Sequence, residues 1–297
     1  MMIVDSLFLL AVSAATLNIE VMQPVDEQKA AQIVEWLNST ADNVSRVYGR
    51  FPNPDAKVIV IPTTENSWGG DAAVIFGRVN RHGGESIELF VNPDRPISEF
   101  YADWTATHEF SHLMLPLLNQ RYRWISEGFA SYYQNVIMSR AGHYTPQIAW
   151  QRLSEGFQRG RESRPELSLN EAAAGGNRRA RMKIYWSGAA IALLADTELR
   201  SRSGGKQSLD TVLGKLQACC LPSRRHWSGP RLFKKLDSFL DSPVFMPLYR
   251  EYANDEGFPD VAPVLHRLGI SRNSDGTVNL NNSAPQAATR RAISTIQ

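Results

Sequence analysis

Three side chains that can bind a metal ion, and a fourth that can act as a base, lie close together in this sequence. His108 and His112 are four residues apart in a His-Glu-x-x-His motif, and Glu127 follows fifteen residues after His112. Side chains four residues apart share one face of a helix, so both imidazoles can reach one ion. Glu109 stands beside the first histidine, where its carboxylate can meet a metal-bound water. Three protein ligands that leave a fourth position open are typical of catalytic zinc. We therefore predict one zinc ion per chain, bound by His108, His112 and Glu127, with Glu109 as the general base.

Two helix-like segments carry these residues. The first, from Ile97 to Leu115, has apolar side chains at helical intervals, and Pro116 offers a natural stop. A short polar turn (119–123) separates it from the second, which extends from Trp124 to Ile137. An antiparallel helix pair would bring Glu127 back to the two histidines. The alternative is an amphipathic surface helix with incidental histidines and a solvated glutamate.

The same motifs resemble those of a known class of zinc enzymes. His-Glu-x-x-His followed by Trp-x-x-Glu-Gly-Phe-Ala (124–130) is similar to the gluzincin metallopeptidases, whose third zinc ligand is a glutamate on the next helix. Residues 124–133 are especially similar to the glycyl aminopeptidase family. Tyr-Trp-Ser-Gly-Ala-Ala (185–190), which continues to Asp196 and Arg200, resembles that family's Tyr-x-Lys-Gly helix with its final Asp-x-x-x-Arg. The resemblance extends from about Tyr48 to Arg200 and implies a zinc hydrolase that acts on peptide or protein substrates.

The sequence also departs from the family pattern. Ser187 replaces the lysine of Tyr-x-Lys-Gly, and the spacing from His112 to Glu127 is shorter than usual. A Gly-x-Met-Glu-Asn or Gly-Leu-Glu-His segment, which grips a substrate's free amino group, does not precede the zinc helix. Its nearest counterpart is residues 83–88, in which Glu85 or Glu88 could bind an amino terminus or simply form a solvated strand face. Exopeptidase and endopeptidase activity both stay open.

A metzincin would carry a glycine and a third histidine just after the motif. Leu115 and Leu118 occupy those two positions, which excludes that class.

The resemblance implies an α+β, thermolysin-like fold. We expect a first lobe (1–142) with a small mixed sheet and the zinc helices, an all-helical second lobe (143–270) that completes the cleft, and a polar C-terminal tail (271–297) that is a weakly ordered loop with a short helix at best. In such a fold the edge strand nearest the zinc pairs with the substrate backbone, and Ser86–Val91 is our candidate. The resemblance also assigns Tyr185 as the donor that stabilises the developing oxyanion. The alternative for Tyr185 is a core tyrosine at the start of an aromatic-rich helix.

The remaining elements follow from hydrophobic periodicity and from proline and glycine stops. We expect strands at 17–22, 57–62, 73–77 and 86–91. We expect further helices at 26–48, 147–158, 182–200, 209–218, 231–239 and 246–253. Ligating histidines usually bond a carboxylate, carbonyl or water through their second nitrogen, and Asp103 and Ser131 are near enough in sequence to do so.

Composition bounds the class of protein. The chain has 297 residues, of which 43% are hydrophobic and 21% charged, with a net charge of +2. These values are typical of a soluble globular protein and give no sign of nucleic acid or an anionic membrane as a partner. The two cysteines, Cys219 and Cys220, are adjacent, and a disulfide between neighbours closes a strained ring, so we expect buried thiols at a helix end.

The amino terminus allows two interpretations. Leu7 to Ala15 is an apolar run that ends in small residues, yet Asp5 stands where a secretory signal would carry a basic residue. The run is too short to span a bilayer. We favour a core segment leading into the first strand, which leaves export and a cytoplasmic location both open. The sequence does not fix the oligomeric state.

Two rival functions remain at this stage. One is a zinc-binding scaffold that has lost turnover, although the retained Glu109 argues against it. The other is hydrolysis of a non-peptide substrate, such as an epoxide or ester, at the same zinc.

Overall fold

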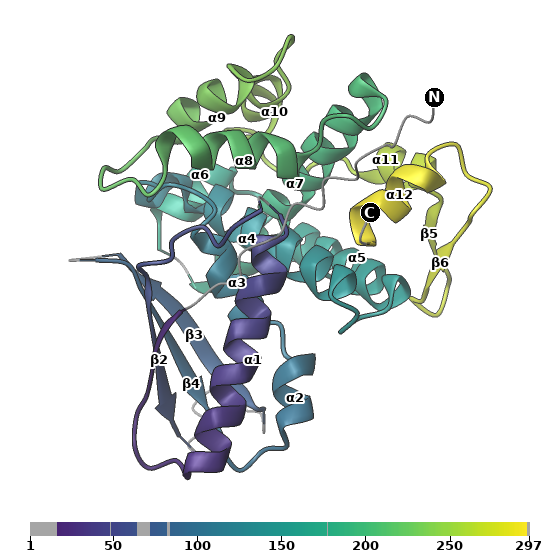
Figure 1. The fold of residues 1–297 in the computed structure, drawn as a ribbon. Coiled ribbons are helices and arrows are strands. Elements are labelled where there is room, and N and C mark those ends of the chain that lie inside the picture. The colour runs from purple at the N-terminus through teal and green to yellow at the C-terminus, as the bar shows by residue number, and fades with distance from the viewer. Residues whose placement is uncertain (1–16, 48, 64–71, 82–83, 177, 296–297) are drawn as a thin grey trace, which may run out of the picture.

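The computed structural model describes residues 17–47, 49–63, 72–81, 84–176 and 178–295 (Figure 1). Its only sheet of more than two strands within those residues has four strands in the order β1-β2-β4-β3. The strands are β1 (Asn18–Val21), β2 (Lys57–Pro62), β3 (Val74–Asn80) and β4 (Ser86–Val91). β1 is parallel to β2 and β2 to β4, whereas β3 is antiparallel to β4, so the predicted mixed sheet is confirmed. Along β2 and β4, buried side chains alternate with partly exposed ones, so one face of the sheet is buried.

The prediction that Ser86–Val91 is the edge strand beside the metal was wrong. This segment is β4, and both of its edges are already paired, one with β2 and the other with β3. The edge strand is β3, which lies against the helix that carries the motif histidines. β3 and β4 are joined by a short connection and pair with each other as a hairpin. The other edge of β4 pairs with β2, so β3 is left at the edge of the sheet.

Helices pack against the sheet and make up most of the rest of the chain. α1 (Glu27–Ser45) begins at Asp26, whose carboxylate accepts a hydrogen bond from the amide of Lys29 at 2.9 Å. Its buried side chains, including Trp36, pack towards the sheet and α2 (Ile97–Ala102), and Trp36 meets Phe100 edge to face at 5.2 Å between ring centroids. Figure 1 shows α1 in purple along the sheet with α2 beside it, and most of the later helices gathered at the other end of the molecule.

The segment predicted as one helix from Ile97 to Leu115 is two helices. α2 ends at Ala102, Asp103 has extended backbone (φ −84°, ψ 136°), and α3 (Thr105–His112) follows. The Asp103 carboxylate accepts a hydrogen bond from the amide of Thr105 at 2.7 Å, which satisfies one of the free amides at the start of α3. Apolar periodicity continues across this break, so the periodicity alone could not show that the helix is interrupted.

The rest of the chain is mainly helical. In order, the elements are η1 (Gln120–Tyr122), α4 (Arg123–Arg140), α5 (Pro146–Glu162), α6 (Leu169–Ala174), η2 (Arg178–Ala180), α7 (Arg181–Ser203), α8 (Leu209–Cys220), α9 (Gly229–Asp237), α10 (Phe245–Tyr252), α11 (Ala262–Leu268), β5 (Ile270–Arg272), β6 (Val278–Leu280) and α12 (Ala287–Ser294). The helices predicted from periodicity are all present, whereas the short α6 and α11 were not predicted.

α4 and α7 cross with their backbones in contact. A Cβ atom on Gly128 of α4 would overlap the backbone of Gly188 on α7, and a Cβ on Gly188 would overlap the carbonyl oxygen of Trp124. Only glycine allows so close an approach. Gly128 follows Glu127, and Gly188 lies three residues after Tyr185, so this crossing brings those two functional candidates together.

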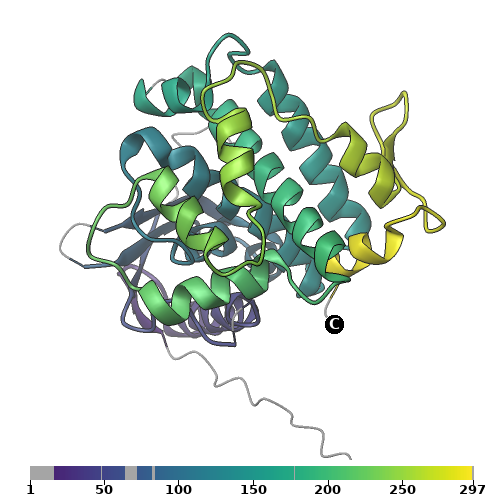
Figure 2. The same ribbon diagram turned by 90° about the horizontal axis from the view of Figure 1, so that it is seen from above.

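The C-terminal tail ends in the short helix that the prediction allowed, α12, but the part before it forms regular structure instead of the weakly ordered edge or loop that we expected. β5 and β6 pair antiparallel, so the region after residue 143 is not purely helical, and α12 packs against α4, α5, α7 and α11 (Figure 2). The backbone carbonyls of Ile293 and Ser294 accept hydrogen bonds from Arg140 and Ser139 at 2.9 and 2.8 Å. These contacts tie the tail to the end of α4. The division into lobes at residues 142 and 270 stays a prediction.

The cysteine prediction was also wrong. Cys219 and Cys220 form a vicinal disulfide with their Cα atoms 3.7 Å apart, and neither residue is buried. The pair occupies the last turn of α8, and Leu221 beyond it has extended backbone and donates its amide to the carbonyl of Gln217 at 3.4 Å.

Within the described residues, no helix combines the length and apolar character that crossing a membrane requires. The apolar run from Leu7 to Ala15 lies outside the described residues.

Candidate metal centre

The three predicted ligands converge. His108 and His112 extend from α3 and Glu127 from α4, and one ligand atom from each lies within 4.8 Å of the others. The Nε2 atoms of both histidines are 3.5 Å from Oε2 of Glu127. That oxygen is buried and has no hydrogen-bond partner among the described residues. A buried carboxylate oxygen without a partner is rare, and coordination to a cation would satisfy it. Two imidazole nitrogens and one carboxylate oxygen are a donor set that fits zinc.

Each histidine is oriented through its second nitrogen. Nδ1 of His108 lies 2.7 Å from Oε1 of Gln134, and Nδ1 of His112 lies 2.9 Å from Oγ of Ser126. Because an amide oxygen only accepts, Nδ1 of His108 carries the proton and Nε2 keeps its lone pair for a metal.

These partners differ from the predicted ones, Asp103 and Ser131. Asp103 instead caps α3, and the carbonyl of Ser131 accepts a hydrogen bond from Asn135. Gln134 could have been predicted as a partner of the site, since it lies two helical turns after Glu127 and therefore on the same face of α4.

The two carboxylates of the centre have opposite electrostatic environments. Burial raises the pKa of Glu109 to about 7, and the charge of Glu127 adds to this effect. Burial alone would also raise the pKa of Glu127, but the adjacent imidazoles of His112 and His108 hold it below its ordinary value. Paired carboxylates whose pKa values are driven apart are typical of divided roles. Here Glu127 keeps the negative charge that a ligand needs, and Glu109 can exchange a proton near neutrality.

Glu109 is held against the edge strand of the sheet. A Cβ on Gly77 of β3 would lie only 2.7 Å from Cγ of Glu109 and 2.8 Å from Cγ2 of Thr105. The carboxylate of Glu109 also accepts a hydrogen bond from the backbone amide of Val79. Gly77 was not predicted as part of the site, although a glycine inside a strand often marks such a close approach.

Tyr185 of α7 also reaches the centre. Its hydroxyl forms a hydrogen bond with the carboxylate of Glu127, and its ring stacks on that of His108 at 5.8 Å with an interplanar angle of 4°. Burial and the charge of Glu127 raise the pKa of Tyr185, so its hydroxyl stays protonated and can donate. The structure thus places Tyr185 beside the candidate metal ligands, and its role towards an oxyanion stays a prediction.

Two cavities meet at this centre. The first, of about 410 Å³, contains Arg123, and we call it the Arg123 cavity. The second, of about 700 Å³, is lined by residues that include Trp186. Both are lined by Phe76, Gly77, Glu109 and Tyr185. The candidate base therefore lies where the two cavities join, and the edge strand β3 extends along both.

Glu85 and Glu88, for which the sequence left open amino-terminus binding or a solvated strand face, are paired with other side chains. Glu88 forms an ion pair with Arg78 at 2.5 Å, and Glu85 pairs with Arg81 at 3.4 Å and accepts a hydrogen bond from Asn53 at 2.5 Å. Neither glutamate lines the two cavities. A substrate amino terminus would therefore have to be bound by other groups.

Comparison with known families supports the class that the site defines. Residues 117–191 match the family model described as M61 glycyl aminopeptidase. The matched segment contains Glu127 and Tyr185 but begins after the His-Glu-x-x-His motif. The resemblance to the gluzincin aminopeptidases is thereby confirmed. A comparison with curated proteins gives no match.

Solved structures share the fold. An aminopeptidase N family protein from Idiomarina loihiensis superposes with a TM-score of 0.62 at 14% identity, over 85% of this chain and 47% of its own. Native leukotriene A4 hydrolase from Saccharomyces cerevisiae gives 0.56 at 14% identity, over 84% and 39%. A mutant M1 zinc metallopeptidase from Deinococcus radiodurans, bound to a Tyr-Ser-Ala substrate, gives 0.50 at 14% identity, over 80% and 46%. The likeness shows a mixed α/β fold similar to that of the M1 aminopeptidases. This chain spans less than half the length of each of these structures.

Proposed function

We propose that this chain is a zinc-dependent metallopeptidase that hydrolyses peptide bonds. His108, His112 and Glu127 bind the zinc, and Glu109 is the general base. The observation that carries the proposal is the convergence of three ligand atoms within 4.8 Å around a buried, unpartnered carboxylate oxygen, with Glu109 on the same helix as two of the ligands. The match to a peptidase family over the third ligand supports peptides as the substrate class.

The residues of the chain divide the chemistry among them. A zinc ion held by His108, His112 and Glu127 would supply a Lewis acid for the scissile carbonyl and would lower the pKa of a water molecule towards neutrality. Glu109 takes the proton from the attacking water and passes it to the leaving amine. The hydroxyl of Tyr185 donates a hydrogen bond to the developing oxyanion.

The edge strand β3 holds the substrate backbone. Within the described residues its outer edge has no strand partner, and it lies along both cavities that meet at Glu109. An extended peptide can add to such an edge through main-chain hydrogen bonds. This role replaces the one that the sequence analysis gave to β4.

Metal content and peptide cleavage test the proposal together. We expect purified protein to contain about one zinc per chain and to cleave members of a diverse peptide library. A chelator should abolish cleavage, and added zinc should restore it. Zinc-loaded protein that cleaves no peptide would contradict the proposal, and a catalytically inactive scaffold or a non-peptide hydrolase would then be the better account. Peptides with free and with blocked amino termini distinguish exopeptidase from endopeptidase activity.

A further inference from the structure

The Arg123 cavity beside the metal centre is lined by three arginines, and two of them are already neutralised. Arg78 pairs with Glu88 at 2.5 Å, and Arg81 pairs with Glu85 at 3.4 Å. Arg81 also donates hydrogen bonds to backbone carbonyls at the end of α3, one of them at 3.0 Å. These two side chains therefore hold β3, β4 and α3 in place.

Arg123 is different. Its side chain forms no ion pair or hydrogen bond with the described part of the chain, and its Nε is buried without an acceptor. A buried donor of a charged group that lacks a partner costs stability, so its retention calls for a reason other than folding.

The position of Arg123 in α4 gives no structural reason for a cation. It is the first residue of the helix, the first turn contains no acidic residue, and Tyr122 before it provides no side-chain cap. A positive charge is disfavoured there because the helix dipole is positive at its N-terminus. The same dipole adds to the attraction of Arg123 for an anion. Because Arg123 lies four residues before Glu127, it is on the face of α4 that meets the metal centre.

We propose that Arg123 is a specificity-determining residue that binds a carboxylate of the peptide substrate. This inference rests on the proposed function. The planar guanidinium matches a carboxylate with two parallel hydrogen bonds, which a lysine at the same place would not reproduce. The carboxylate belongs to an aspartate or glutamate side chain near the scissile bond, or to the free carboxyl terminus of the peptide.

Equilibrium binding tests this inference without turnover. The protein is the zinc-loaded Glu109→Gln variant, and the probes are alanine-rich hexapeptides with a free amino terminus and an amidated carboxyl terminus. Each hexapeptide carries one Glu, moved through every position, and has a partner with Gln in its place. A further series of Gln peptides has a free carboxyl terminus. The kcat/KM values of the wild-type protein are measured on the same peptides.

At one position, or with the free carboxyl terminus, we expect the carboxylate peptide to bind about 10-fold more tightly than its neutral partner. Arg123→Gln should reduce that ratio to about one and leave the neutral peptides bound as before. Arg123→Lys should keep only part of the ratio. Arg121→Gln is the matched control, because Arg121 is exposed and does not line the cavity, and it should keep the full ratio. Circular dichroism establishes that each variant is folded.

Two results would overturn the inference: equal binding of charged and neutral peptides at all positions and both termini, or a ratio that survives Arg123→Gln. The position of the preferred carboxylate identifies its source. An Arg123-dependent ratio in protein that cleaves no peptide would leave the carboxylate site standing and defeat only the proposed function.

Discussion

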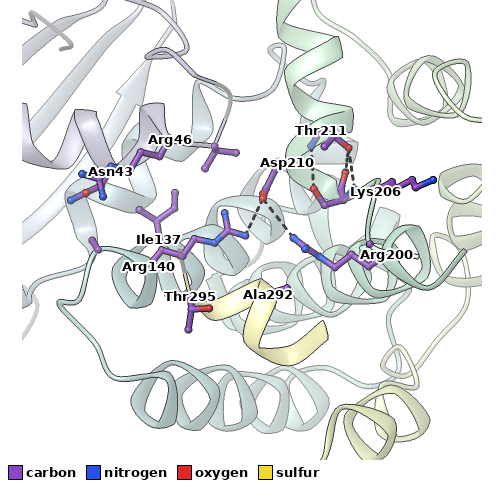
Figure 3. Close-up of a pocket in the computed structure, with 14 residues that line it drawn as sticks. Asn43, Arg46, Ile137, Arg140, Arg200, Lys206, Asp210, Thr211, Ala292 and Thr295 are labelled. Carbon is purple, nitrogen blue, oxygen red and sulfur yellow. Dashed lines mark hydrogen bonds and ion pairs between the residues drawn. The ribbon is translucent and has the colours of Figure 1, made fainter. Parts of the chain in front are cut away.

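Two cavities at opposite ends of α4 show what separates a structural cluster of charges from a reactive one. The cavity at the C-terminal end of α4 has a volume of about 490 Å³ (Figure 3). It is at least as large as the Arg123 cavity of about 410 Å³ at the N-terminal end. Four basic side chains and one acidic side chain line it. Its buried charges neutralise one another, since Asp210 accepts from Arg140 at 2.9 Å and pairs with Arg200 at 3.6 Å, while Arg200 also pairs with Asp196 at 3.0 Å.

The Arg123 cavity leaves such groups unsatisfied. Oε2 of Glu127 and Nε of Arg123 are both buried without a hydrogen-bond partner among the described residues, whereas no polar atom of that kind lines the described part of the other cavity. Volume therefore does not distinguish the two. What differs is the state of the charged groups. Two charged side chains of the Arg123 cavity keep an unsatisfied buried atom, whereas in the other cavity completed ion pairs join α4, α7 and α8.

The largest expected effect is the loss of metal from Glu127→Gln. Because Glu127 is the only charged ligand of the three and an amide replaces its carboxylate, we expect zinc affinity to fall about 1000-fold, measured by competition with a chromogenic chelator. The free energy of unfolding of the metal-free protein should change by less than about 1 kcal/mol. A variant that binds zinc as tightly as the wild type would contradict the ligand assignment.

The opposite pattern is expected at the other cavity. Asp210→Asn leaves Arg140 and Arg200 without their shared carboxylate, so we expect the free energy of unfolding to fall by about 3 kcal/mol in denaturant titrations, with zinc content unchanged. Lys206→Gln is the control, because this exposed lysine lines the same cavity outside that network, and it should have little effect. A loss of zinc from Asp210→Asn would remove the contrast between the cavities.

Removing the acceptor behind His108 should have a smaller effect. Gln134→Leu leaves Nδ1 of His108 without its partner, and we expect zinc affinity to fall about 10- to 100-fold while the protein stays folded. Ser126→Ala should act in the same direction through His112. Unchanged affinity in both variants would show that packing alone orients the two imidazoles.

The smallest effect is expected from Gly77→Ala. The added methyl would press on Cγ of Glu109 at 2.7 Å, so the base shifts while the ligands stay. We expect kcat to fall about 10-fold with zinc content unchanged. Loss of zinc rather than of kcat would show that β3 supports the whole centre and not the base alone.

The convergence of the three candidate metal ligands could be predicted from the sequence because helical spacing is a local property. His108 and His112 share a helix face whatever surrounds them, and the match of Glu127 to a known motif completed the set. Gln134 lies on that same face of α4 and could have been found by the same rule.

Other features depend on contacts that no local pattern encodes. The edge position of β3 is decided by which strand pairs with β2. The contact of Gly77 with Glu109 requires β3 and α3 to lie together, and the unpaired state of Arg123 is defined by what its neighbours in space do not offer. The strands β5 and β6 of the C-terminal tail were not predicted because they are too short to show periodicity. Tertiary contacts with α4 hold this region in place.

Replacement of the base tests the central claim most directly. Wild-type protein and Glu109→Gln, each loaded with zinc, should both contain about one zinc per chain, because Glu109 is not a ligand. We expect kcat/KM on the best peptide substrate to fall about 1000-fold in the variant. A variant that keeps its zinc and retains the wild-type rate would contradict the assignment of Glu109 as the general base.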